Sequence, residues 1–198
     1  MGLGELGAVT MPRWVPNALS LLRIGLVPAW LALATAERMR AVDGLAVRRF
    51  WVVGLLVLVG LTDFLDGQLA RRLHLATRAG ALLDAVADKL ATFTAVTFLT
   101  FFGAPAFTPL PVELWAVLIG RDLLLGTGAI TLWLRHRRVD FEHRWHGRVA
   151  TALLFLTVLL SCAAAPPALV YLLAAAVGAL AIAGTADYLW AGLKVMRS

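Results

Sequence analysis

Long apolar stretches alternate with short polar ones along most of this chain. Six apolar stretches stand out, and each is close to the ~20 residues that a helix needs to cross a ~30 Å hydrocarbon layer. They cover about residues 16–36, 50–71, 80–102, 112–134, 147–164 and 168–189. Helix-breaking residues separate several of them: Asp43-Gly44, the proline-containing run 103–111, and Pro166-Pro167. The pattern predicts an all-α integral membrane protein with six transmembrane helices, forming a single domain over residues 1–198.

Composition agrees with this interpretation. Hydrophobic residues make up 61% of the 198 residues and charged residues only 15%, which is too apolar for a soluble domain. The net charge of +6 is attributed to cytoplasmic arginines and contact with anionic lipids, not to nucleic acid. The single cysteine, Cys162, excludes an internal disulfide and is expected to be a small buried hydrophobe.

The distribution of Lys and Arg predicts the orientation. If both termini are cytoplasmic, most of the basic residues fall on the inside, as in a bacterial-type cytoplasmic membrane protein. The first loop is an exception that the positive-inside rule does not explain, and an interfacial segment is one interpretation of it. Its arginines are Arg38, Arg40, Arg48 and Arg49.

Four aspartates interrupt two of the predicted spans: Asp63 and Asp66 in one, Asp84 and Asp88 in the next. A charged residue at the centre of a spanning helix costs roughly 2.5–3.5 kcal/mol on insertion scales, so something must compensate these carboxylates. Residues three or four apart share one helix face, and the short turn 71–79 can bring the two faces together near the cytoplasmic end. Hard oxygen ligands suit Mg²⁺, Mn²⁺ or Ca²⁺, and four carboxylates are enough for two ions.

Small residues and one arginine accompany the acids. Gly67 and Ala70 leave open space beside them, and Gly80 permits close approach of a ligand or helix. Arg71 supplies a fixed cation suited to phosphate oxygens. Together with metal ions these residues indicate a pyrophosphate site, where two metals can stabilise attacking and leaving oxygens. A cation-transport path competes with this interpretation, since intramembrane acids often mark one, but it does not explain the small residues and Arg71.

The whole stretch from Asp63 to Asp88 reads D-x2-D-G-x2-A-R-x8-G-x3-D-x3-D. This resembles, without a departure, the signature of the CDP-alcohol phosphatidyltransferases, integral membrane enzymes of phospholipid synthesis. Eight specified positions at fixed spacing make the match highly specific. The resemblance extends along the chain through the six spans and the early Pro16-Asn17…Arg23 stretch.

The resemblance implies a role for each motif aspartate. Asp63, Asp66 and Asp84 would hold two divalent metals, Mg²⁺ or Mn²⁺, with Asp88 at or near the second metal. Asp88 would also be the general base on the acceptor hydroxyl, where a base within hydrogen-bond reach is needed.

The resemblance also implies a CDP site and a reaction. The CDP site would be lined by Asp63, Gly67, Ala70, Arg71 and Gly80. The alcohol oxygen would attack the lipid-side phosphorus of CDP-diacylglycerol, and CMP would leave. Metals and Arg71 would offset the charge that builds on the CMP leaving group. The active site would face the cytoplasm, and the resemblance implies a homodimer.

The acceptor alcohol is a further question. Lys89 after Asp88 resembles the glycerol-type branches, phosphatidylglycerophosphate synthase and cardiolipin synthase, whereas inositol-type members more often carry Arg there. The fourth span has Arg121-Asp122 where phosphatidylglycerophosphate synthases tend to have Arg-Glu and a further Arg, but Ala129 stands at that later place. We therefore place phosphatidylglycerol slightly ahead of glycerol 3-phosphate as acceptor. An inositol-type acceptor and a non-enzymatic cation transporter are the alternatives.

Three cations are candidates for contact with an anionic acceptor: Arg121, Arg148 and Lys89. Each has a structural alternative. Arg121 could pair internally with Asp122 or another acid, and Arg148 could be a positive-inside anchor. Lys89 points off the acid stripe, which favours a snorkelling role.

Overall fold

Six helices follow one another in the computed structural model, which describes residues 15–73, 78–134 and 145–197, and no strand occurs in these ranges. They are α1 (Val15–Val42), α2 (Arg49–Leu73), α3 (Arg78–Phe102), α4 (Val112–Leu134), α5 (Trp145–Cys162) and α6 (Pro167–Arg197). Within these helices, the side chains outside the description are those of residues 15–20, 63–73, 78–79, 81–82, 84, 129–130, 132–134, 145–146 and 191–197.

Each helix coincides with one of the six apolar stretches, so the all-α prediction is confirmed. Two helices continue more than one turn past the spans expected from the sequence: α1 continues to Val42 and α6 to Arg197. Arg38 and Arg40 are therefore helical residues, not part of a loop. By length and hydropathy, two segments of the described chain could cross a membrane, Ala85–Phe102 and Pro167–Trp190. Arg49–Thr62 and Gly147–Cys162 are shorter apolar helical segments.

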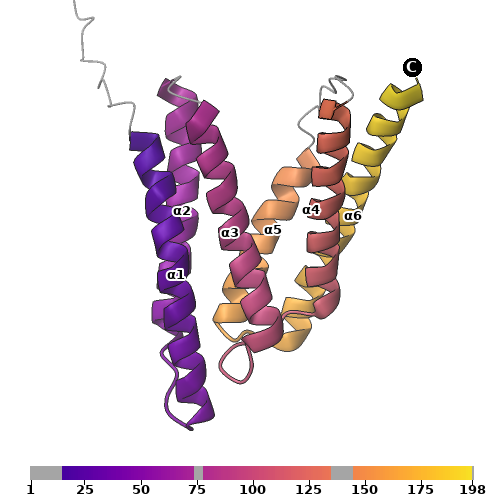
Figure 1. Ribbon diagram of the computed structural model, residues 1–198. Coiled ribbons are helices and arrows are strands. Elements are labelled where there is room, and N and C mark those ends of the chain that lie inside the picture. Colours follow the sequence, from indigo (N-terminus) through magenta and orange to yellow (C-terminus); the bar gives the residue numbers. More distant parts are fainter. Residues whose placement is uncertain (1–14, 74–77, 135–144, 198) are drawn as a thin grey trace, which may run out of the picture.

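The helices form two groups of three (Figure 1). Helix α1 packs along α2 and α3, and α6 packs along α4 and α5, while contacts between the groups are fewer. The α1–α2, α3–α4 and α5–α6 connections lie at one end, drawn at the bottom of Figure 1. The opposite end carries the C-terminus and the ends of α2 and α3 that face the 74–77 connection.

The hydrophobic core lies toward the end with the three short connections. Trp30 of α1 packs edge-on against Phe98 of α3, with ring centroids 5.8 Å apart, and Phe107 of the α3–α4 loop contacts the same Phe98 at 6.2 Å. Leu99, Val170 and Val177 are almost completely buried in this cluster. The core thus joins the two groups at the end away from the aspartate motif.

The α3–α4 loop is part of this core. Thr108 donates through its hydroxyl to the Ala165 carbonyl at 2.6 Å, and its own carbonyl accepts from the Ser161 hydroxyl at 2.5 Å. The Thr108 amide also donates to the Ser161 carbonyl at 3.1 Å. These bonds satisfy a buried loop backbone, which would otherwise be costly, and they tie α3 and α4 to the α5–α6 turn.

Two helices end in the same hydrogen-bonded motif. At the end of α1, Gly44 has φ 71°, and Leu45 donates its amide to the Arg40 carbonyl at 2.8 Å. At the end of α5, Ala164 has φ 54°, and Ala165 donates to the Leu160 carbonyl at 2.9 Å. This 6→1 bond with a left-handed residue is the Schellman cap, in which glycine is the usual residue. Ala164 holds that position with a side chain.

Candidate active site

The eight motif positions all lie on two consecutive helices. Asp63, Asp66, Gly67, Ala70 and Arg71 belong to the last turns of α2, and the remaining three positions belong to the first half of α3. Both stretches are helical, as the spacing of the aspartates predicts. Only residues 74–77 separate the two helices, so Leu73 and Arg78 can be at most about 17 Å apart. The motif is therefore confined to the adjoining ends of α2 and α3.

The extent of burial is described for only two of these positions, Gly80 and Asp88. Gly80 is half-buried, and Asp88 is exposed on α3. The side chains of Asp63, Asp66, Asp84 and Arg71, and the surroundings of Gly67 and Ala70, lie outside the described part of the structure. Their roles as metal ligands and CDP contacts therefore remain predictions.

A metal site is compatible with the donor set but is not visible as a cluster. No group of three or more His, Cys, Asp or Glu residues occurs among the described side chains, which leave out three of the four predicted ligands. The four predicted ligands are all carboxylates, which are hard oxygen donors of the kind that Mg²⁺ and Mn²⁺ prefer. The residue types at the motif positions thus fit a divalent ion.

Lys89, one residue after Asp88, has a partner on the facing helix. Its ammonium forms an ion pair and hydrogen bond with the carboxylate of Asp122 on α4. The Lys89 side chain is 61% exposed and that of Asp122 is 35% exposed. The pair joins α3 to α4, so Lys89 has a structural role whether or not it also meets an acceptor.

An apolar groove of about 590 Å³ lies beside this ion pair, between α3 and α4. Phe93 and Val96 line it from α3, and Trp115 and Leu118 from α4. Asp88 is not among the residues that line it. The groove is thus lined in part by α3, which carries three of the motif positions, but the proposed base Asp88 does not line it.

The two arginine candidates differ in environment. Arg121 is half-buried on α4, and its Nε atom is buried with no hydrogen-bond partner among the described residues. Its neighbour Asp122 pairs with Lys89 instead. Arg148 is exposed near the start of α5. A buried guanidinium nitrogen without a partner is costly, so Arg121 fits a ligand-binding role better than an internal pair.

Two buried charged residues were not among the predicted site residues. Arg23 on α1 is only 1% exposed, although it lies in an apolar span. Its position within that span and its place in the stretch that resembles the family were the available signals. Glu37 is 5% exposed near the end of α1 and interacts with the α1–α2 turn. The sequence offered no comparable signal for Glu37, because its partners are a backbone amide and a neighbouring arginine.

Comparison with known proteins decides the family. The profile of "CDP-alcohol phosphatidyltransferase" matches residues 13–186, which is most of the chain. The chain belongs to the CDP-alcohol phosphatidyltransferase family. The prediction from the motif is thereby confirmed, and this phosphatidyltransferase is assigned as an enzyme of phospholipid biosynthesis.

Curated relatives of this phosphatidyltransferase carry two names. A CDP-diacylglycerol--glycerol-3-phosphate 3-phosphatidyltransferase of Aquifex aeolicus is 34% identical over 145 residues, 73% of each chain. A cardiolipin synthase (CMP-forming) of Streptomyces coelicolor is 32% identical over 182 residues, 90% of this chain and 79% of the relative. A putative cardiolipin synthase of Mycobacterium tuberculosis is 35% identical over 123 residues, 61% of this chain but only 51% of the relative.

Proposed function

We propose that this phosphatidyltransferase transfers the phosphatidyl group of CDP-diacylglycerol to a glycerol-type alcohol and releases CMP. The observation that carries the proposal is the complete eight-position motif on the adjoining ends of α2 and α3. The names of the relatives support a glycerol-type acceptor over an inositol-type one. The family assignment favours an enzyme over a cation path.

Within the proposed reaction, each group of residues has one task. Asp88 accepts the proton of the acceptor hydroxyl, which raises the nucleophilicity of that oxygen. Arg71 and the small residues Gly67, Ala70 and Gly80 hold and orient the diphosphate of CDP-diacylglycerol. Asp63, Asp66, Asp84 and Asp88 would hold two divalent ions, which supply charge neutralisation on the phosphate oxygens. As CMP departs, the Arg71 guanidinium stays beside the leaving phosphate.

We place phosphatidylglycerol ahead of glycerol 3-phosphate as the acceptor, with cardiolipin as the product. The support is Ala129, which stands where a phosphatidylglycerophosphate synthase tends to have a further arginine for an anionic acceptor. Arg121 and Arg148 are the proposed contacts to the acceptor phosphate, and Lys89 is a weaker third because Asp122 already engages it.

The proposal includes a membrane setting. All six helices cross the membrane, the ends of α2 and α3 that carry the motif face the cytoplasm, and the enzyme is a homodimer. Support comes from the apolar segments of α3 and α6 and from the excess of basic residues at the motif end. Homodimers are implied by the family resemblance alone.

The test is CMP release by the purified full chain in mixed micelles containing CDP-diacylglycerol and Mg²⁺ or Mn²⁺. Phosphatidylglycerol, glycerol 3-phosphate, inositol and serine are supplied one at a time. Asp88→Asn should lower the rate by about 10²–10⁴-fold, the usual contribution of a general base. Asp43→Asn, which changes an exposed carboxylate at the opposite end, is the matched control and should keep full activity.

Each result has a defined meaning. Release with phosphatidylglycerol alone, lost with EDTA and restored by the metal, supports the full proposal. Release with glycerol 3-phosphate alone changes the product to phosphatidylglycerophosphate. No release with any acceptor, in folded protein that binds divalent metal, contradicts the glycerol-type assignment.

A further inference from the structure

Residues 37–51, which comprise the end of α1, the connection 43–48 and the start of α2, are called the α1–α2 turn from here on, and they concentrate positive charge at the end of the molecule away from the motif. Four arginines and two acids lie in residues 37–51. The other two connections at this end, residues 103–111 and 163–166, contain no charged residue. These four arginines are the ones that the positive-inside rule does not explain. They are Arg38, Arg40, Arg48 and Arg49.

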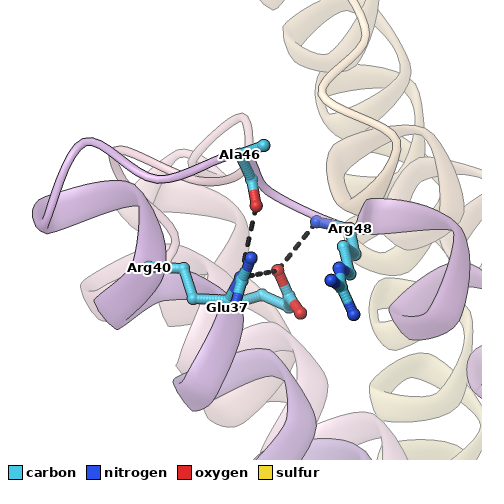
Figure 2. A network of polar contacts seen from close by, with 4 residues as sticks. All are labelled: Glu37, Arg40, Ala46 and Arg48. Atoms are coloured by element: carbon cyan, nitrogen blue, oxygen red, sulfur yellow. Dashed lines mark hydrogen bonds and ion pairs between the residues drawn. The ribbon is translucent and has the colours of Figure 1, made fainter.

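Glu37 organises the turn (Figure 2). Its carboxylate accepts the Arg48 amide hydrogen at 2.7 Å and forms an ion pair with Arg40 Nε at 3.4 Å. Arg40 Nε also donates to the Ala46 carbonyl at 3.2 Å. Because Glu37 is almost fully buried, its contacts with Arg40 and Arg48 hold in place the backbone that carries the arginines. The partner that Arg48 offers to Glu37 is its backbone, so its guanidinium is not used in this contact.

Two further arginines are fixed against the α3–α4 loop. Arg49 Nε donates to the Ala106 carbonyl at 2.7 Å, and Arg38 Nε donates to the Ala104 carbonyl at 3.3 Å. A guanidinium has five N–H donors. Each of these bonds uses the Nε–H, which leaves the terminal amino groups for another acceptor. Pairs of terminal N–H groups match the oxygens of a phosphate in a bidentate manner.

Exposed apolar side chains lie close to these arginines in the sequence. Phe50 and Trp51 are 63% and 56% exposed and contact each other, with ring centroids 4.8 Å apart. Val42 and Leu45 are similarly exposed in the same turn. Exposed aromatic residues next to arginines are typical of a segment at the boundary between hydrocarbon and headgroups. The turn therefore has the composition of an interfacial segment, with its cations held in place.

We propose that the α1–α2 turn is a binding site for the phosphate of an anionic phospholipid in the leaflet at that end of the enzyme. The occupant follows from charge and composition: a net positive turn, guanidinium groups held through Nε with spare donors, and exposed apolar side chains suited to contact with acyl chains. A zwitterionic lipid carries a cation that four arginines repel, so the site discriminates between headgroups. The proposal rests on the membrane setting given above but not on the transfer reaction or its acceptor.

The experiment measures which lipid lies next to the turn. Leu45→Cys gives an accessible thiol for a fluorophore, because the natural Cys162 is buried. The labelled full chain is placed in bilayer nanodiscs that contain phosphatidylcholine and phosphatidylmethanol, with only one of the two brominated as a quencher. Phosphatidylmethanol is anionic but has no free hydroxyl, so it cannot serve as a phosphatidyl acceptor. The ratio of quenching by the two lipids gives their relative association with the turn.

We expect phosphatidylmethanol to associate at least fivefold more strongly than phosphatidylcholine. Arg48→Gln should weaken this preference about fivefold, the value of one arginine near an anionic surface. Arg48→Lys, which keeps the charge and the backbone bond to Glu37, should keep most of the preference. Lys194→Gln, near the end of α6 at the opposite end of the molecule, should leave it unchanged, and 0.5 M salt should reduce it.

Three results would overturn the proposal: equal quenching by the two lipids, a preference that Arg48→Gln does not alter, or no quenching by either lipid. The last result would show that the turn is outside the membrane interface. CMP release by the same samples reports separately on the proposed transfer reaction, so failure of one proposal is distinguishable from failure of the other.

Discussion

Lys89 on α3 and Asp122 on α4 form an ion pair that connects helices belonging to different three-helix groups. Both residues lie near the middle of their helices. A charge at this depth of a spanning helix is costly unless it is paired, and each residue supplies the partner of the other. In the proposed membrane setting, the pair accounts for two charges that would otherwise oppose insertion of α3 and α4.

A double-mutant cycle tests this relationship. Lys89→Met and Asp122→Asn should each destabilise the protein, and the coupling between them should be about 0.6 kcal/mol and at most about 1.7 kcal/mol, as for other interhelical polar contacts in membranes. Lys89→Met should be the more harmful single change, because it leaves the less exposed Asp122 carboxylate unpaired, whereas after Asp122→Asn the more exposed Lys89 side chain can snorkel toward water. Thermal unfolding in detergent gives the four values, and strictly additive effects would contradict the pair.

The end of α3 depends on a glycine. A Cβ atom at Gly103 would lie 2.6 Å from the Leu99 carbonyl oxygen, and backbone atoms cannot move aside as a side chain can. Gly103→Ala should therefore destabilise the protein by about 1–3 kcal/mol, the usual cost of overpacking. Gly54→Ala is the matched control, since nothing lies within 4 Å of its Cβ position inside α2. Comparing the melting temperatures of the two variants checks this, and equal values would contradict the clash.

At the end of α5, replacing a residue by glycine is expected to stabilise the protein. Ala164 adopts φ 54°, a left-handed conformation that costs a residue with a side chain roughly 1–2 kcal/mol. Ala164→Gly should remove this cost, less the greater chain entropy of glycine in the unfolded state, for a net gain of about 0.5–1 kcal/mol. A rise in Tm of roughly 2 °C is expected. Ala163→Gly, one residue earlier, should lower Tm instead, so a fall in both variants would argue against relief of strain.

Much of the architecture was predictable because apolar stretches of helical length are a local property of the sequence. All six helices and the burial of Cys162 follow from that property. The extension of α1 was not predictable, because a helix does not have to stop where its apolar residues stop. Residues after Ala36 continue the helix with polar side chains such as Glu37 and Arg40.

Tertiary partners were the part that the sequence did not reveal. Asp122 was considered as a partner for the adjacent Arg121, whereas it pairs with Lys89, which is 33 residues away in the sequence. Arg38 and Arg49 donate to backbone carbonyls of the α3–α4 loop. Every residue has a backbone carbonyl, so the sequence does not show which one an arginine will bind. The aspartate motif differs from both cases, because its spacing alone predicts a shared helix face, and the side-chain geometry that it implies stays a prediction.

Substitution of Arg71 is the test that best distinguishes a phosphatidyltransferase from a cation-transport path. A guanidinium can bind two phosphate oxygens at once, whereas an ammonium acts as a point charge, so Arg71→Lys keeps the charge and loses the bidentate geometry. A hydrogen bond to a charged group is worth about 1.5–3 kcal/mol, so kcat/KM for CDP-diacylglycerol should fall by roughly 10- to 100-fold. The measurement is CMP release at limiting CDP-diacylglycerol, with divalent-cation flux into proteoliposomes recorded for the same variant. Unchanged CMP release would contradict the role of Arg71 at the diphosphate. A cation path would depend on the charge of the residue and not on its planar shape, so it predicts that the flux is unchanged in Arg71→Lys.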